Sequence, residues 1–153
     1  MNLDDMYRET ILDHNQNPRN RGHLENPTKS VGLLNPTCGD EIALDVQLDA
    51  GKVSDIRFSG QGCSISMASA SMLTEAVKGK SAEEALAIAR NFKSFLTGTT
   101  EPENLGDLEA LHGVSQFPSR VKCATLAHNA FFLQVFANAM VDNLGFILCR
   151  YAG

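Results

Sequence analysis

The sequence has no long hydrophobic run and no cluster of basic residues. Because no stretch approaches the roughly 20 apolar residues that a membrane-spanning helix needs, we expect no membrane association. The net charge is -5, and nucleic-acid binding needs grouped lysine and arginine, so a nucleic-acid partner is not expected. Residues 1–5 are acidic and lack the basic start of a secretory signal. We therefore expect the protein to reside in the cytoplasm.

Cysteine is also scarce, with four residues in a chain of 153. In a reducing compartment, cysteines of this kind are metal ligands, nucleophiles or buried hydrophobic residues more often than disulfide partners. The composition is that of an ordinary globular protein, with 43% hydrophobic and 20% charged residues. The length suits one domain over residues 1–153, and we assign no motif to the tail, residues 144–153.

The first half of the chain predicts a helix followed by three strands. Apolar side chains recur at helical spacing over residues 3–13, and proline and glycine end this helix within residues 17–22. Apolar and polar residues then alternate, or form a short apolar run, in three segments bounded by turn residues: 31–34, 42–48 and 56–58. These three strands predict a small antiparallel meander with one buried face.

The second half predicts helices. One should begin at Ser64 and end before Gly79, and Ser81 with Glu84 forms a capping box that opens the next. A short helix is expected over residues 105–113, and the longest should begin near Pro118. We therefore predict an α+β fold, a small three-stranded antiparallel sheet with helices packed on one face.

A thiol and a carboxylate come together in residues 35–40, Asn-Pro-Thr-Cys-Gly-Asp, between two predicted strands. Cys38 should lie at the tip of this loop. Gly39 allows backbone angles closed to other residues, so that Asp40 can turn back toward the same point. This loop is the first candidate site.

Two further cysteines lie at predicted helix starts. Cys63 is at the junction of the third strand with the following helix, where the unpaired N–H groups favour a thiolate. Cys123 lies early in the last helix, and Arg120 and Lys122 are expected to lower its pKa. A lone cysteine is more often a buried hydrophobic residue, but these flanking residues favour a functional role.

Three thiolates and a carboxylate are a ligand set that tetrahedral zinc accepts. We therefore predict that one metal ion is bound by Cys38, Asp40, Cys63 and Cys123. Asp40 is a hard donor among soft thiolates, so it can leave most easily, which favours reactivity over a purely structural site. Cys149 lies in an apolar run and is interpreted as a packing residue.

The histidines are weaker candidates for metal ligation. His14 and His23 flank the loop after the first helix and are expected to be solvated or hydrogen-bonded. His112 should close the short helix, and His128 lies near the apolar stripe of the last helix as a histidine at the edge of the core.

At these residues the chain resembles the iron-sulfur assembly proteins of the IscU and SufU family. The resemblance covers most of the chain and is carried by four ordered segments: 35–40, 60–66 (Gly-Gln-Gly-Cys-Ser-Ile-Ser), 77–81 (Val-Lys-Gly-Lys-Ser) and 120–123 (Arg-Val-Lys-Cys). The SufU branch is the more similar one, because Lys122 stands where the scaffold branch has a histidine. Residues 101–116 resemble an insertion typical of that branch.

The resemblance implies zinc bound by the three cysteines and Asp40, and transfer of persulfide sulfur to Cys38. The implied partners are a pyridoxal-phosphate cysteine desulfurase of the SufS type, which would supply a replacement zinc ligand, and downstream iron-sulfur assembly proteins. Cys38 would then leave the zinc ion as a thiolate and attack the outer persulfide sulfur, while Asp40, Cys63 and Cys123 keep the metal.

Two alternatives remain open. The first is a scaffold that builds a [2Fe-2S] cluster on Cys38, Cys63 and Cys123, with Asp40 or His128 completing the ligation, and passes it to apoproteins. The second is a binding module with a purely structural zinc ion, which would unfold on chelation.

Overall fold

The computed structural model describes residues 2–36, 38–98, 101 and 105–141, the last six of them by their backbone alone. Along the chain the elements are α1 (Leu3–Gln16), β1 (Lys29–Asn35), β2 (Asp40–Asp49), β3 (Lys52–Gln61), α2 (Ser64–Val77), α3 (Ala82–Leu96), the 3₁₀ helix η1 (Gly106–Gln116) and α4 (Pro118–Val141). The predicted tail, residues 144–153 with Cys149, lies outside the described residues.

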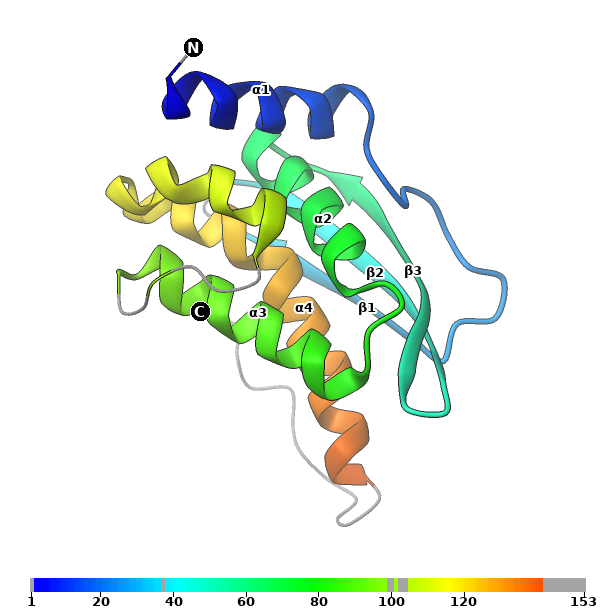
Figure 1. The fold of residues 1–153 in the computed structure, drawn as a ribbon. Helices are drawn as coiled ribbons and strands as arrows, with labels where there is room; N and C mark the ends of the chain where they lie inside the picture. Colours follow the sequence, from blue (N-terminus) through cyan, green and yellow to red (C-terminus); the bar gives the residue numbers. More distant parts are fainter. Residues whose placement is uncertain (1, 37, 99–100, 102–104, 142–153) are drawn as a thin grey trace.

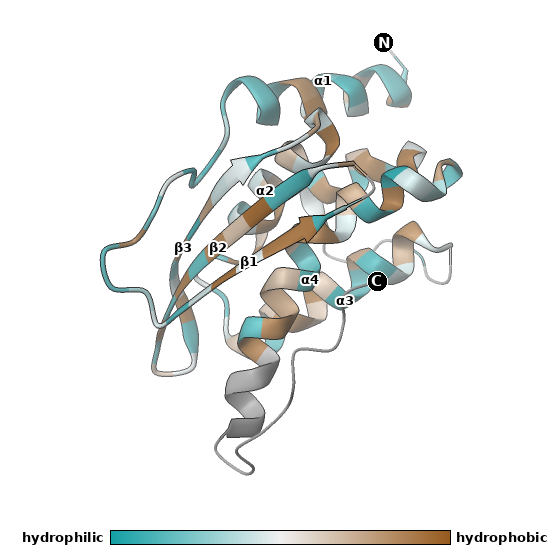
Figure 2. Ribbon diagram, turned by 180° about the vertical axis from the view of Figure 1, so that it is seen from behind, coloured by the Kyte–Doolittle hydropathy of each residue, from teal (hydrophilic) through white to brown (hydrophobic). Residues whose placement is uncertain are grey.

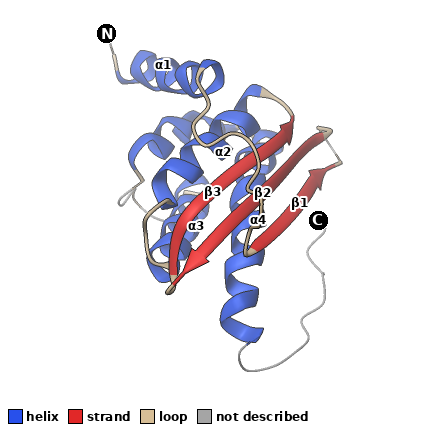
Figure 3. Cartoon of the chain, turned by 90° about the vertical axis from the view of Figure 1, so that its right-hand side faces the viewer, coloured by secondary structure: helices blue, strands red, loops and turns tan. Residues whose placement is uncertain are grey.

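The three strands form one antiparallel sheet in the order β1-β2-β3, which confirms the predicted meander (Figure 3). Alternate side chains of the central strand, Ile42, Leu44 and Val46, are fully buried. This alternation is what a strand with one covered face requires. Figure 2 shows hydrophobic residues along β1 and β2. The strands extend beyond the predicted segments, because polar residues at their ends continue the ladder.

The helices of the described residues lie on one side of the sheet, as predicted for an α+β fold (Figure 1). α4 packs against β1 and β2 and also contacts α2 and α3, while α1 contacts α2 and η1. One cluster of buried apolar residues therefore spans the sheet and the helices, with Phe58, Phe92 and Phe131 among its largest members. None of the described helices is both long and apolar enough to span a bilayer.

The short helix expected after α3 is present, and its type, which the prediction left open, is 3₁₀. The expected short helix, 105–113, is the 3₁₀ helix η1, Gly106–Gln116. Its larger buried side chains are Leu108, Leu111 and Val114, with Leu105 just before them, and the small side chain of Ala110 is buried too. The larger side chains recur at every third position, which matches three residues per turn rather than 3.6. An apolar period of three therefore favoured the tighter helix.

The capping box before α3 is confirmed. The side chain of Ser81 accepts a hydrogen bond from the backbone N–H of Glu84, with a donor–acceptor distance of 3.2 Å. This bond satisfies one of the N–H groups that a helix start leaves without an intrahelical partner.

Candidate metal centre

The four predicted ligands gather at one end of the sheet. Antiparallel pairing places the β1–β2 loop, which carries Cys38, beside the end of β3, which leads to Cys63. In Figure 3 the β1–β2 connection and the end of β3 lie at the same end of the sheet. α4 packs against β1, and its first turns bring Cys123 to this same end of the sheet.

The distances between these side chains are short. The sulfurs of Cys38 and Cys123 are 3.2 Å apart, and both cysteines are free rather than disulfide-bonded. The Asp40 carboxylate lies with these two sulfurs in a group whose ligand atoms are all within 4.8 Å of one another. The sulfur of Cys63 is 3.7 Å from Asp40 Oδ2. The structure thus places Cys38, Asp40 and Cys123 in one group of possible ligands, and Cys63 lies beside Asp40 without belonging to that group.

The backbone of the β1–β2 loop explains how Asp40 reaches this point. Gly39 has φ +73°, in the left-handed region that glycine adopts without a steric penalty. Its N–H donates to the carbonyl of Asn35 at 2.8 Å, which closes the loop just before the two strands begin to pair at Asn35 and Asp40. Asp40 is consequently buried, whereas Cys38 stays exposed at the loop.

Asp40 also fixes the start of α2. Its Oδ1 accepts a hydrogen bond from the backbone N–H of Cys63 at 2.9 Å, at the N-cap position of the helix. A Cβ atom on Gly62 would lie 2.6 Å from that same oxygen and 2.6 Å from Ser66 Oγ. Glycine is therefore required here to let the carboxylate approach the backbone.

The predicted effect of the cations on Cys123 is wrong in sign. Burial raises the pKa of the Cys123 thiol well above its usual range, and a hydrogen bond with Asp40 adds to this effect. Lys122 is exposed to solvent and does not reverse it. Removal from water penalises the thiolate more than the neighbouring charges stabilise it, so this thiol is deprotonated only when a cation or donor compensates.

Arg120 is a cation that interacts with the thiols. The charges of Cys63 and Cys123 are the main cause of a raised pKa of the Arg120 guanidinium, and hydrogen bonds to both sulfurs contribute. Arg120 itself is exposed at the start of α4, so the site has a cationic rim open to solvent.

Sequence reasoning missed two neutral residues that contact the thiols. Asn35 donates a side-chain N–H to Cys123 Sγ at 3.8 Å, and Ser66 Oγ lies 3.6 Å from Cys63 Sγ. Ser66 is three residues after Cys63 on the same helix, so helical spacing offers a signal for it. Asn35 and Cys123 are 88 positions apart, and an asparagine before proline indicates only a turn.

His14 is buried and hydrogen-bonded, which is one of the two states, solvated or hydrogen-bonded, that the sequence predicted. Its Nδ1 lies 2.7 Å from Ser71 Oγ and its Nε2 lies 2.9 Å from Asp107 Oδ2. Glu75 completes a group of three possible ligands there. Because both ring nitrogens of His14 already have protein partners, this network is satisfied without an ion and joins α1 to α2 and η1.

His128 lies in the core and away from the thiols. Its ring stacks on Phe92 with centroids 4.1 Å apart, and burial, with a smaller contribution from Lys93, lowers its pKa to about 3. His128 belongs to neither group of possible metal ligands among the described residues. Of the two residues considered for completing an iron-sulfur cluster, the structure places Asp40 beside the thiols and His128 elsewhere.

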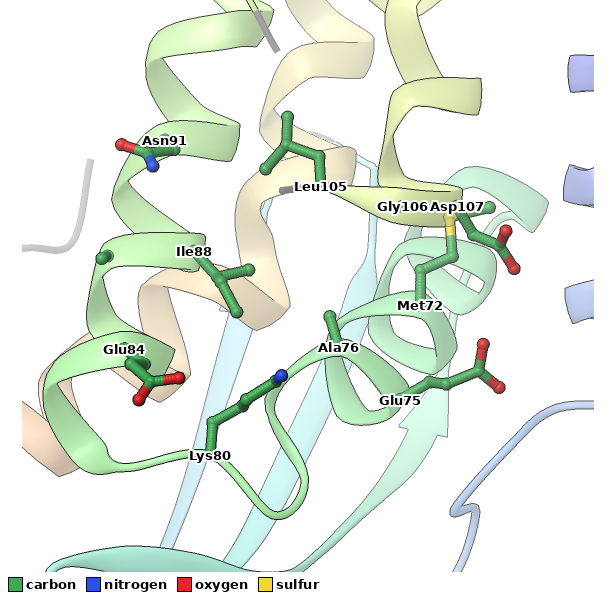
Figure 4. Close-up of a pocket in the computed structure, with 11 residues that line it drawn as sticks. Met72, Glu75, Ala76, Lys80, Glu84, Ile88, Asn91, Leu105, Gly106 and Asp107 are labelled. Atoms are coloured by element: carbon green, nitrogen blue, oxygen red, sulfur yellow. The ribbon is translucent and has the colours of Figure 1, made fainter. Parts of the chain in front are cut away.

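A pocket of about 730 Å³ lies between α2, α3 and η1, away from the thiols (Figure 4). Its apolar lining includes Met72, Ile88 and Leu105, and Figure 4 shows Lys80 and Glu84 at its rim. None of the described cysteines lines it, so the metal chemistry predicted for Cys38, Cys63 and Cys123 does not belong to this pocket.

The donor set fits a zinc ion. For zinc bonds of about 2.3 Å to sulfur and 2.0 Å to oxygen, tetrahedral geometry separates two sulfurs by about 3.8 Å and a sulfur from an oxygen by about 3.5 Å. The observed separations are 3.2 Å for Cys38 and Cys123, and 3.7 Å for Cys63 and Asp40. The two sulfurs of Cys38 and Cys123 would have to separate by about 0.6 Å to reach that geometry. Cys63, which lies outside the group of ligand atoms within 4.8 Å of one another, would have to move toward the other sulfurs.

The comparisons with known proteins point to one family. The family model of the NifU-like N-terminal domain matches residues 6–124. The chain is 53% identical to the zinc-dependent sulfurtransferase SufU of Bacillus subtilis over 131 residues, which cover 84% of this chain and 88% of that protein. It is 48% identical to the iron-sulfur cluster assembly scaffold protein IscU of Streptococcus pyogenes over 144 residues, or 93% of this chain and 90% of that protein.

Solved structures share the fold. A protein described as an iron-sulfur cluster assembly scaffold of the SUF system, from Fervidobacterium islandicum, superposes with a TM-score of 0.80 at 32% identity, covering 88% of this chain and 99% of that chain. A crystal structure of a hypothetical protein gives a TM-score of 0.82 at 46% identity with the same coverage.

These findings confirm the resemblance carried by the three cysteine-containing segments. The family match includes Cys38, Asp40, Cys63 and Cys123. By the extent of the family match and the identity to its relatives, which are named as a zinc-dependent sulfurtransferase and as an iron-sulfur cluster assembly scaffold, this chain belongs to the family of NifU-like N-terminal domains.

Proposed function

We propose that this protein is a zinc-dependent sulfur-transfer protein of iron-sulfur cluster assembly that accepts persulfide sulfur on Cys38. The observation that carries the proposal is one exposed thiol, Cys38, placed 3.2 Å from the buried thiol of Cys123 in a cluster with Asp40. The SufU relative, named as a zinc-dependent sulfurtransferase, supports the assignment.

Zinc would be held by Cys38, Asp40, Cys63 and Cys123. When bound, it would keep the thiols deprotonated at neutral pH, including the buried Cys123, whose burial otherwise opposes the thiolate. Asp40 Oδ1 is already engaged by the N–H of Cys63, which leaves Oδ2 as the oxygen that faces the sulfurs.

Cys38 is the thiol best placed to receive sulfur from another protein. It is exposed, whereas Cys63 is half-buried and Cys123 is fully buried. Thiol exchange requires direct approach of one sulfur to another, so access decides among thiolates of similar reactivity. Arg120, at the rim, is placed to attract an anionic persulfide toward the exposed thiol.

The transfer step balances without an oxidant or reductant. The Cys38 thiolate attacks the outer sulfur of a cysteine persulfide on the donor protein, and a new sulfur–sulfur bond forms on Cys38. The sulfur–sulfur bond of the donor breaks, and its electron pair leaves on the donor cysteine as a thiolate. The transferred outer sulfur keeps the charge that it had on the donor, so the thiolate consumed on Cys38 is balanced by the thiolate formed on the donor cysteine.

The donor in this proposal is a pyridoxal-phosphate cysteine desulfurase of the SufS type, because such an enzyme produces a protein-bound persulfide. The receivers are downstream iron-sulfur assembly proteins. We place this exchange in the cytoplasm, in agreement with the three described cysteines, which are all free.

A second function is supported by the relative named as an assembly scaffold. In that case Cys38, Cys63 and Cys123 would provide three ligands for a [2Fe-2S] cluster carried as cargo, and Asp40 the fourth. Anaerobic reconstitution separates the two: a coloured cluster that is passed to an apoprotein favours the scaffold, and its absence in a zinc-loaded protein favours sulfur transfer.

The experiment for the proposed function is a single turnover with a persulfide-loaded desulfurase. We expect mass spectrometry to find the added sulfur on Cys38, and we expect Cys38→Ser to abolish stimulation of the desulfurase, because the accepting thiolate is gone. Cys149→Ser is the matched control and should behave as wild type. Full stimulation by Cys38→Ser would remove Cys38 from its role.

A further inference from the structure

We propose that Asn35 is a positioning residue that protects the persulfide formed on Cys38 from attack by Cys123. The inference rests on the proposed function, and it assigns a role to a side chain at the end of β1 rather than to a metal ligand. It starts from the closeness of two sulfurs that must not react with each other.

The distance of 3.2 Å between Cys38 Sγ and Cys123 Sγ creates a chemical hazard. Once Cys38 carries an extra sulfur, a Cys123 thiolate can attack Cys38 Sγ itself. A Cys38–Cys123 disulfide then forms, the persulfide bond breaks, and its electron pair leaves with the outer sulfur as hydrosulfide. The atoms and electrons balance, and the sulfur is lost before it reaches an acceptor.

Asn35 contacts the sulfur that would attack. Its side-chain Nδ2 donates to Cys123 Sγ at 3.8 Å, and both residues are buried. A hydrogen bond to a thiolate draws electron density from the sulfur lone pairs and holds the sulfur in place, so it lowers nucleophilicity. In a buried site this donor is not replaced by water.

The bond treats the two sulfurs unequally. Cys123 receives the Asn35 amide at the base of the site, whereas Cys38 is exposed on the loop above it. Cys38, which must accept sulfur, therefore stays accessible, and Cys123, which could attack the persulfide, is fixed by the Asn35 hydrogen bond. Asn35 is suited to this task because its own carbonyl closes the Cys38 loop through the N–H of Gly39 at 2.8 Å.

That backbone bond permits a clean test, since substitutions of the side chain leave it in place. Asn35→Leu removes the N–H donors while keeping a branched side chain of similar shape, and Asn35→Ala removes both donors and volume. Asn91→Leu, on α3 at the pocket between α2 and η1, is the matched asparagine control away from the thiols.

The zinc-loaded full chain would be given one equivalent of sulfur by a persulfide-carrying protein under anaerobic conditions. We expect both Asn35 variants to release hydrosulfide roughly tenfold faster than wild type, the effect of losing one hydrogen bond to a charged group. Peptide mapping should find the Cys38–Cys123 disulfide in the same proportion. In cobalt-substituted protein, the thiolate charge-transfer band should move to longer wavelength in both variants.

Hydrosulfide release within twofold of wild type in a folded Asn35→Leu would overturn the proposal. A faster release in Asn35→Ala alone would also overturn it, because the cause would be lost packing and not the lost donor. Failure of both variants to fold would make Asn35 a folding residue and count against a protective role. If wild type takes no sulfur on Cys38, the proposed function itself fails, which is a different result.

Discussion

At the scale of single residues, Gly62 decides whether Asp40 can reach its place. A Cβ atom at this position would lie 2.6 Å from Asp40 Oδ1, inside any real contact distance. We predict that Gly62→Ala displaces the carboxylate, breaks its hydrogen bond to Cys63 and weakens zinc binding roughly tenfold or more. Competition with a chromophoric chelator measures this affinity.

The control for that substitution is Gly32→Ala on β1. The nearest atoms to a Cβ there are 3.9 Å away, an ordinary contact. It should leave zinc binding unchanged. Equal zinc affinity of Gly62→Ala and wild type, in folded protein, would show that Asp40 does not need its present position.

Single residues also show where the sequence stops being informative. Cys38, Gly39 and Asp40 are neighbours in the chain, so their grouping was predictable from local geometry. The contact of Asn35 with Cys123 was not, because the fold alone brings together residues 88 positions apart. The pKa of Cys123 was misjudged for a related reason: burial is a property of the folded chain, and it outweighed the nearby cations.

At the scale of elements, the start of α3 depends on Ser81. Its side chain accepts the N–H of Glu84 at 3.2 Å. Loss of an N-cap side chain typically costs about 1 kcal/mol, so Ser81→Ala should lower the free energy of unfolding by about that amount. Urea denaturation measures it. Ser94→Ala, inside the same helix, should be neutral or slightly stabilising, and equal losses in the two variants would contradict the capping role.

The packing of α4 on α3 predicts a dependence of stability on pH. Burial lowers the pKa of His128 to about 3 in the folded protein, whereas in the unfolded chain it is about 6.5. Between these values the unfolded chain binds the extra proton, so stability is lost as pH falls below about 6.5, by roughly 1.4 kcal/mol per pH unit. His128→Phe keeps a ring against Phe92 without the titration.

Urea denaturation of wild type and His128→Phe at pH 7.5 and pH 5 isolates this contribution. The difference in the free energy of unfolding between the two proteins should change with pH in favour of the variant at the lower value. A constant difference would show that His128 is protonated in the folded protein or never titrates in the unfolded chain.

Helix and strand positions were largely predictable, since the apolar periods of two and 3.6 residues differ clearly. η1 was predicted as a helix without its type, and an apolar residue at every third position, from Leu105 to Val114, belongs to a 3₁₀ helix. A short segment with glycine at Gly106 and Gly113 has too few turns for the two helical periods to be told apart from the sequence.

At the scale of the whole molecule, the sheet and α4 act as a frame that brings distant segments to one end of the fold. β1, β2 and β3 supply the Cys38 loop and the approach to Cys63, and the packing of α4 against β1 adds Cys123. The order of the strands was predictable from their short turns. The placement of α4 was not, because nothing local in the sequence specifies which part of the sheet a late helix covers.

The most direct test of this frame is zinc X-ray absorption on the full chain, purified without added metal. The account predicts one zinc ion per chain with three sulfur neighbours at about 2.3 Å and one oxygen at about 2.0 Å. Cys38→Ser should lose one sulfur from that shell. A shell of nitrogen and oxygen only, or protein that holds no zinc, would contradict the claim that Cys38, Asp40, Cys63 and Cys123 bind one ion.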